Sequence, residues 1–209
     1  GAAIEIGKRG DADVVFVHAK EQEIKAVEDG WFVNRYDVMY NDFIIIGPSD
    51  DRIKIKGTRS AVEALRKIAK SASLFVSRGD KSGTHTKELS IWQKTGIDPK
   101  DKKWYLEVGQ GMEKTQRIAN EKRAYTLTDR GTWLATKDKD KLDMAIVLEG
   151  DSILFNQYGV MAVNPEKHSH VKYKEAMEFV NWLVSKEGQE AIASFKDKNG
   201  NQLFIPNGK

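Results

Sequence analysis

Short apolar runs rich in β-branched residues alternate with segments of helical periodicity along most of the chain. The run at 42–48 places three isoleucines between Phe43 and Gly47 and ends at a proline, which is typical of a buried strand. We expect strands at 13–18, 42–48, 74–76, 124–127, 145–148 and 153–163. We expect helices at 19–28, 60–72, 84–92, 112–122, 132–136, 171–185 and 187–195. This alternation predicts an α/β fold with open, mostly parallel sheets, in which ligands bind where strands lead into helix starts.

The charge balance and the missing cysteines exclude several classes of partner and chemistry. Lysine plus arginine total 34 against 31 acidic residues, a formal net charge of +3. Proteins that bind nucleic acid have an excess of basic residues clustered on one surface, so we expect no nucleic-acid partner. The absence of cysteine excludes disulfides, zinc–thiolate sites and thiol nucleophiles. No apolar run approaches the ~18 residues that cross a bilayer, and no charged segment followed by an apolar stretch opens the sequence.

The segment 77–84 is the first candidate site, because it follows an expected strand and opens an expected helix. Its candidate side-chain donors to a ligand are three hydroxyls and one guanidinium, on Ser77, Arg78, Ser82 and Thr84. Free N–H groups and the dipole at a helix start favour an anion, and Gly79 and Gly83 let a ligand approach the backbone. In the alternative interpretation, Ser82 or Thr84 only caps the helix and Arg78 is a solvated charge. The segment lacks the spacing of a nucleotide-binding P-loop and of a serine nucleophile elbow.

A second segment, 126–132, has the same form of strand, hydroxyl-rich turn and helix. It contributes Thr128, Asp129 and Arg130 as candidate ligand-binding residues. Asp129 either orients Arg130 or Arg78, or is a plain N-cap. Two such segments in one chain favour anion binding over coincidence.

His18 ends an expected strand and is therefore a candidate at the edge of a site, although a lone histidine is more often a packed residue. Catalysis by Ser82 or His85 would need a base and a group that orients it, and no such pair occurs at a readable spacing. We therefore expect a binding protein that is not an enzyme.

Three longer motifs are specific enough to compare with a known family. They are VSRGDKSGTH at 76–85, GQGM at 109–112 and YTLTDRGT at 125–132, joined by GDADV at 10–14 and MYNDF at 39–43. Together they resemble the tungstate-binding proteins of bacterial ABC importers, which are type II periplasmic binding proteins, over essentially the whole chain. The resemblance implies two α/β lobes, 1–46 with 155–209 and 47–154, joined by a hinge near 44–47 and 152–156.

The resemblance also implies a function. A tetrahedral oxyanion, tungstate or possibly molybdate, would be the ligand, with no other cofactor and no separate metal site. The expected ligand-binding set is Arg78, Ser77, Ser82, Gly83, Thr84, Thr128, Asp129, Arg130 and His18. The partner would be the membrane permease of an ABC importer, and the location periplasmic or extracytoplasmic. The alternative is a ligand-sensing effector domain of a transcription regulator with the same fold.

The front of the chain departs from the family pattern. Family members begin with a strand, a Thr-Thr-Thr-Ser loop and a helix, and Thr-Thr-Thr-Ser does not occur here. We therefore expect the first lobe to have an exposed sheet edge or to pair through that edge with a second chain as a dimer.

Overall fold

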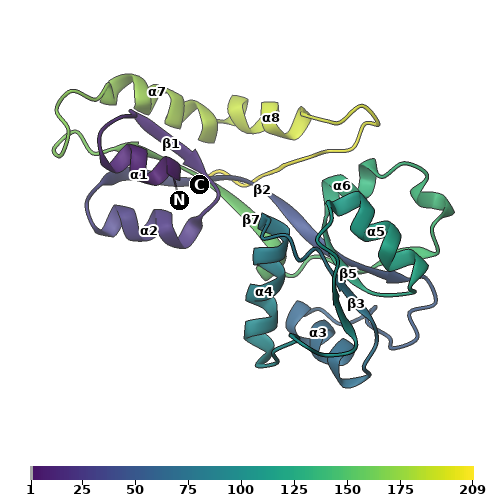
Figure 1. Cartoon of the computed structure of the whole chain (residues 1–209). Helices are drawn as coiled ribbons and strands as arrows, with labels where there is room; N and C mark the ends of the chain where they lie inside the picture. Colours follow the sequence, from purple (N-terminus) through teal and green to yellow (C-terminus); the bar gives the residue numbers. More distant parts are fainter. Residues whose placement is uncertain (1) are drawn as a thin grey trace. The chain divides into compact units, whose positions relative to one another are not determined.

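A computed structural model describes residues 2–209, which form two compact units. Of the described residues, unit 1 comprises 2–41 and 156–209, and unit 2 comprises 42–155. The long strand β2 (Phe32–Pro48) contributes its first part to unit 1 and its last part to unit 2 (Figure 1). The lobe borders expected at 46/47 and 154/155 stay a prediction; the borders of the two units lie nearby, at 41/42 and 155/156.

Unit 1 combines a small sheet with four helices. Its elements besides β2 are α1 (Ala2–Lys8), β1 (Val14–Val17), α2 (Lys20–Glu28), β7 (Phe155–Val163), α7 (Tyr173–Val184), α8 (Lys186–Ser194) and β8 (Ile205–Pro206). β1 pairs antiparallel with β7, with Val14 opposite Ala162. Ile4 of α1 and Phe32 of β2 are buried against Met161 of β7, which explains why an amphipathic α1 forms where the sequence predicted no element. β1 stands at one end of the strand order, and pairing of this edge with a second chain stays a prediction.

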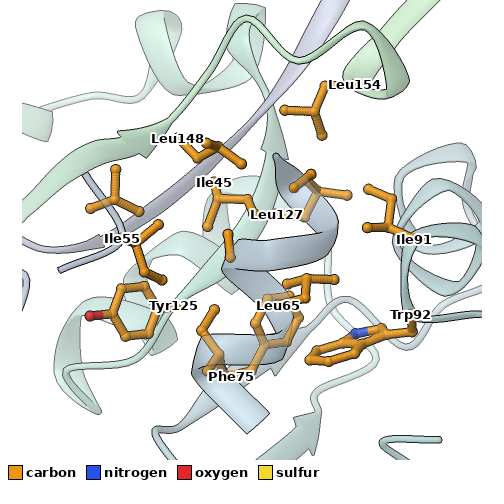
Figure 2. Packing of buried hydrophobic residues seen from close by; sticks show 14 residues of the cluster. Ile45, Ile55, Leu65, Phe75, Ile91, Trp92, Tyr125, Leu127, Leu148 and Leu154 are labelled. Carbon is orange, nitrogen blue, oxygen red and sulfur yellow. The ribbon is translucent and has the colours of Figure 1, made fainter. Parts of the chain in front are cut away.

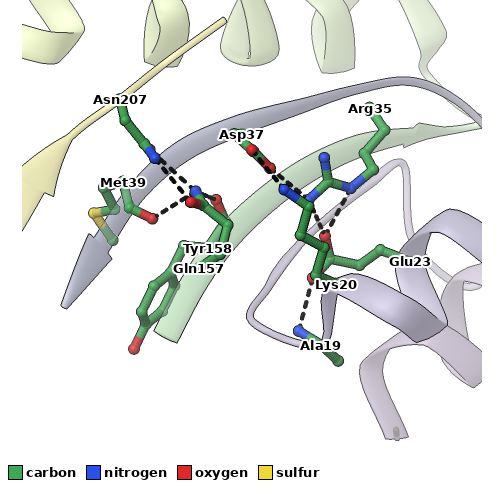
Figure 3. Close-up of polar contacts among 9 residues, drawn as sticks. All are labelled: Ala19, Lys20, Glu23, Arg35, Asp37, Met39, Gln157, Tyr158 and Asn207. Atoms are coloured by element: carbon green, nitrogen blue, oxygen red, sulfur yellow. Dashed lines mark hydrogen bonds and ion pairs between the residues drawn. The ribbon is translucent and has the colours of Figure 1, made fainter. Parts of the chain in front are cut away.

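The first part of β2 was not predicted as a strand because charged residues interrupt its apolar pattern. Arg35 donates through Nε to Glu23 Oε2 at 2.9 Å and through Nη2 to Asp37 Oδ1 at 2.7 Å. Nearby, Gln157 Nε2 donates to the Met39 carbonyl at 2.9 Å (Figure 3). These partners satisfy the polar groups that burial in a sheet would otherwise penalise.

Unit 2 carries a sheet flanked by helices. Its elements besides β2 are α3 (Ala61–Lys70), β3 (Phe75–Ser77), α4 (Gly83–Thr95), β4 (Tyr105–Glu107), α5 (Met112–Glu121), β5 (Thr126–Asp129), α6 (Arg130–Ala135), β6 (Met144–Leu148) and the short 3-10 helices η1 (Lys139–Lys141) and η2 (Ser152–Leu154). The main core packs α3 and α4 against the strands, with Ile45, Leu65, Phe75 and Trp92 almost fully buried (Figure 2). Each such side chain contributes about 1.5–3 kcal/mol through the removal of apolar area from water.

The prediction of mostly parallel sheets is correct for β3 to β6 of unit 2, which share one direction. It is wrong for the pairs that β2 and β1 form, which are antiparallel. β3 pairs parallel with β4, and a parallel bridge joins Phe75 to Tyr125, next to β5. β5 and β6 both run antiparallel to β2, so β3 to β6 all run in one direction and β2 runs against them. In unit 1, β7 brings the chain back into the unit and runs against β1. Parallel neighbours need a crossover connection, whereas β2 is paired with β5 and β6 in the antiparallel manner.

None of the helices among residues 2–209 is both long enough and apolar enough to span a bilayer.

Candidate anion-binding site

Three neighbouring strands of unit 2, β3, β4 and β5, run in the same direction. Ser77 at the end of β3 lies opposite Glu107 at the end of β4, and the Val108 amide donates to the Ser77 carbonyl at 3.1 Å. On the other side of β3, the Val76 amide donates to the Tyr125 carbonyl at 2.8 Å. Because these strands are parallel, the segments that follow them meet at the same edge, where ligands bind in open α/β sheets.

The loop 78–82 is held in shape by its own hydrogen bonds. The amides of Gly79, Lys81 and Ser82 donate to Ser77 Oγ (3.2 Å), His85 Nδ1 (3.0 Å) and Asp80 Oδ1 (3.1 Å). Gly79 has a φ of +60°, and a Cβ there would lie 2.8 Å from the Glu107 Cβ, so no larger residue fits without a shift. The loop is therefore preorganised before any ligand arrives.

Helix α4 begins at this loop with unpaired donors. Ser82 is its N-cap and accepts from the His85 amide at 3.3 Å, as the capping interpretation predicted. Among residues 2–209, the amides of Gly83 and Thr84 have no acceptor, nor does the Thr84 hydroxyl. The space that a Cβ on Gly83 would occupy is open to 4 Å.

Arg78 is mostly buried beside the same helix start, with 19% of its side chain exposed. Its Nη2 donates to Asp80 Oδ2 at 2.5 Å, whereas its Nε is buried and has no partner within residues 2–209. Burial alone would raise the pKa of Asp80, but hydrogen bonds from Ser82 and Arg78 lower it. Arg78 thus shares its charge with Asp80 and keeps one buried N–H donor unpaired.

His85 adds a donor that the sequence interpretation considered only for catalysis. Its side chain is 9% exposed, and its Nδ1 accepts from the Lys81 amide, which places the hydrogen of a neutral ring on Nε2. Within the described part of the chain, Nε2 has no hydrogen-bond partner. The carboxylate oxygen Oε1 of Glu107 is 3.6 Å away, which is too far for a hydrogen bond. The sequence does carry a signal for this donor. His85 is three residues after the N-cap Ser82, and residues three apart lie on the same face of a helix.

The Ser77 hydroxyl faces the protein interior. Ser77 is fully buried, and its Oγ donates to Glu88 Oε2 at 2.6 Å while accepting from the Gly79 amide. The hydroxyl hydrogen expected to serve an anion is therefore used by an internal carboxylate.

The second predicted segment is satisfied by its own neighbours. Thr128 is buried, accepts from Gln116 Nε2 at 2.9 Å and donates to the Asp129 carbonyl. Asp129 caps α6 through the Thr132 amide at 2.7 Å, which matches the plain N-cap alternative.

Arg130, the remaining candidate of this segment, is held by carboxylates. It donates to both oxygens of Asp42 (2.8 and 2.6 Å) and pairs with Glu149 at 2.8 Å. The Asp42 hydrogen bond is the main reason why the pKa of Arg130 is raised further. Sequence reasoning had no sign of this pair because Asp42 is 88 residues away.

His18 belongs to unit 1, whereas all the other candidates belong to unit 2. Its Nδ1 is 3.1 Å from Asn156 Oδ1, and its ring lies 4.9 Å from that of Tyr158. Among residues 2–209, no three His, Asp or Glu side chains are grouped so that they could hold a metal ion.

The parallel strand ends, the fixed loop and the helix start with unpaired donors define a class: α/β domains that bind a ligand at the carboxyl edge of a sheet. The chain belongs to the PBP superfamily, because a family model described as a PBP superfamily domain matches residues 1–187.

Known relatives and solved structures agree with this membership. A relative from Haloferax volcanii is 48% identical over 99% of this chain, and the chain spans 61% of that relative's length. The tungstate-binding protein TupA from Desulfovibrio alaskensis G20 has a similar structure, with a TM-score of 0.90, 42% identity and coverage of 100% of this chain and 84% of that chain. A tungstate ABC transporter structure from Geobacter sulfurreducens has a TM-score of 0.66 and 52% identity, covering 93% of this chain and 82% of that chain.

Proposed function

We propose that unit 2 binds a tetrahedral oxyanion, tungstate first and molybdate next, at the start of α4. One observation carries the proposal: donors without acceptors gather at this point of the chain. They are the amides of Gly83 and Thr84, the Thr84 hydroxyl, Arg78 Nε and His85 Nε2. Arg78 Nε and His85 Nε2 are buried, and buried donors are rarely left unpaired, so a ligand that is rich in acceptors and has no donor of its own fits this set.

The charges explain why neutral groups carry much of the binding. Arg78 offers one positive charge, which Asp80 already shares, against the two negative charges of a tungstate or molybdate ion. The helix dipole adds roughly half a positive charge at the start of α4, and preorganised N–H groups add charge-assisted hydrogen bonds. Because the donors are fixed, an ion of the wrong size leaves some of them unpaired, which is the basis for selection among tungstate, molybdate and sulfate.

The names of the similar proteins support transport as the purpose of binding. One is a tungstate-binding protein and another is a tungstate ABC transporter. In this proposal the protein captures the oxyanion outside the cytoplasm and delivers it to the permease of an ABC importer, without breaking a bond. The sequence upstream in the gene tests the location: a signal sequence is expected, whereas a DNA-binding helix-turn-helix would favour the effector domain of a regulator.

Calorimetry of the Arg78→Gln variant tests the site. We expect tungstate binding to weaken by about a hundredfold, because a charged donor is replaced by a neutral one. Arg123→Gln is the matched control, since Arg123 pairs with Asp50 and Asp143 on an exposed face of the same unit. Equal affinity in both variants would remove Arg78 from the site, and no tungstate, molybdate or sulfate binding by the unmodified protein would overturn the function.

A further inference from the structure

Directly behind the proposed site lies a buried carboxylate with no cationic partner. Glu88, on α4, is 2% exposed. It accepts from Ser77 Oγ at 2.6 Å, from the Tyr105 hydroxyl at 2.6 Å and from Trp92 Nε1 at 3.1 Å. All three donors are neutral, and no ion pair of Glu88 occurs among residues 2–209. Such a carboxylate carries a large desolvation cost when it is ionised.

The surrounding groups add no positive charge to Glu88. From β4 it faces the neutral Tyr105 and the negative Glu107, and one turn earlier on α4 is His85, whose Nε2 is 3.6 Å from Glu107. Arg78, on the loop after β3, is paired with Asp80. Burial, helped by Glu107 and opposed by the three hydrogen bonds, raises the pKa of Glu88 to about 7.

The protonation state of Glu88 decides what the Ser77 hydroxyl can do. When Glu88 is ionised, Ser77 donates its only hydrogen inward to Oε2. When Oε2 carries a proton, Glu88 becomes the donor in this hydrogen bond. Ser77 Oγ then accepts from Glu88 and from the Gly79 amide, and its own hydrogen is released to a new acceptor.

We propose that Glu88 is a positioning residue of the oxyanion site, which takes up one proton from solvent when a doubly charged oxyanion binds and thereby turns the Ser77 hydroxyl into a donor to the anion. The proposal rests on the proposed function. A second negative charge placed close to a buried carboxylate favours its protonated form, so binding and proton uptake assist each other. Only the proton moves, from water to Oε2, and no other bond changes.

Glu88→Gln mimics the protonated state. Its amide oxygen can accept from Trp92 and Tyr105, which both bond to Oε1, and its NH₂ can donate to Ser77, which bonds to Oε2. Tungstate dissociation constants at pH 6.5 and pH 8.5 are the readout. In the unmodified protein we expect Kd to rise by about twentyfold between these pH values. In Glu88→Gln we expect less than about a twofold change, with the affinity of the unmodified protein at pH 6.5.

Glu113→Gln is the matched control, because Glu113 is an exposed carboxylate of the same unit, paired with Arg117 on α5. It should keep the pH dependence of the unmodified protein. Calorimetry in buffers of different ionisation enthalpy at pH 8 should count about one proton taken up per tungstate, and none in Glu88→Gln. If Glu88→Gln does not fold, Tyr105→Phe replaces it: loss of one donor to the carboxylate should move the midpoint of the pH dependence upward.

The outcomes separate this proposal from the proposed function. If the unmodified protein binds tungstate and Glu88→Gln shows the same pH dependence, the role of Glu88 is overturned and the function stands. The same holds if Tyr105→Phe leaves the midpoint of the pH dependence unmoved. Absence of tungstate binding at every pH overturns the function and the role of Glu88 together.

Discussion

Among residues 2–209, each unit has one buried glutamate, Glu23 in unit 1 and Glu88 in unit 2, and the two have different kinds of partner. Glu23 in unit 1 is fully buried and pairs with Arg35 at 2.8 Å, while it also accepts from the Ala19 amide at 2.7 Å. Glu88 in unit 2 is almost as buried and is held only by a serine, a tyrosine and a tryptophan. Arg35 of β2 ties this strand to α2 through Glu23, and it also binds Asp37 of its own strand (Figure 3).

The comparison separates a buried carboxylate that is held in an ion pair from one that has neutral donors as its partners. An ion pair compensates the charge of Glu23 and suits a fixed joint between elements. Neutral donors stabilise the ionised form of Glu88 less, so that a proton can join it near neutral pH. The uncompensated carboxylate is also the one that lies behind the unpaired donors.

The largest expected effect on stability comes from removing Arg35, the ion-pair partner of Glu23. Arg35→Met leaves a buried charge without its partner and should lower the free energy of unfolding by about 3–5 kcal/mol, measured by urea denaturation at pH 7. The double variant Glu23→Gln with Arg35→Met should recover most of the loss. A loss below 1 kcal/mol in Arg35→Met would mean that the two carboxylates do not differ as described.

A smaller effect is expected from Glu88→Gln, and it depends on pH. The pKa of Glu88 is raised from 4.5 to about 7 in the folded protein. The protonated carboxyl therefore contributes stability to the folded protein that is fully present below pH 4.5 and is lost as pH rises through 7. The free energy of unfolding of the unmodified protein should therefore fall, relative to that of Glu88→Gln, by about 3 kcal/mol between pH 4.5 and pH 8. A difference between the two proteins that stays constant over this range would contradict a raised pKa.

Tyr105→Phe should have the next smaller effect. It removes the 2.6 Å hydrogen bond to Glu88 Oε1 and should cost about 1–2 kcal/mol at pH 8, where the carboxylate is ionised. At pH 5.5 the cost should be lower, because a protonated carboxyl is a weaker acceptor. Equal costs at both pH values would show that Tyr105 contributes packing alone.

The smallest expected effect comes from removing one N-cap serine in each unit and comparing the two variants. Ser82 caps α4 in unit 2 and Ser185 caps α8 in unit 1, each by accepting an amide three residues ahead. Replacing either by Ala should lower the free energy of unfolding by about 1 kcal/mol. Calorimetry should show weaker tungstate binding in Ser82→Ala alone; equal affinity in the two variants would mean that the Ser82 loop does not serve the ligand.

Much of the fold could be predicted because the signals are local. Ser60 caps α3 by accepting from the Glu63 amide, and the apolar spacing that follows is buried at Leu65 and Ile68. The first part of β2 could not be predicted, since Arg35 becomes compatible with a sheet only through Glu23 on another element. The direction of β2, opposite to that of β5, is also not encoded by any pattern within the strand.

The candidate site divides in the same way. The helix start at Gly83 and Thr84 follows from a glycine and hydroxyls placed after a strand. The inward turn of the Ser77 hydroxyl depends on Glu88, which lies eleven residues away, and the pairing of Arg130 depends on Asp42, which lies 88 residues away. Composition alone does not distinguish a free donor from one that is already used.

By itself the sequence determined most of the strands and helices, the loop that opens α4 and the caps, because each of these depends on groups within about one helical turn of each other. Only the tertiary structure decided which of the polar groups at the sheet edge keep an unpaired donor. That depends on partners brought across the sheet by packing, and a buried hydrogen bond forms only where the backbone of both elements has already been placed.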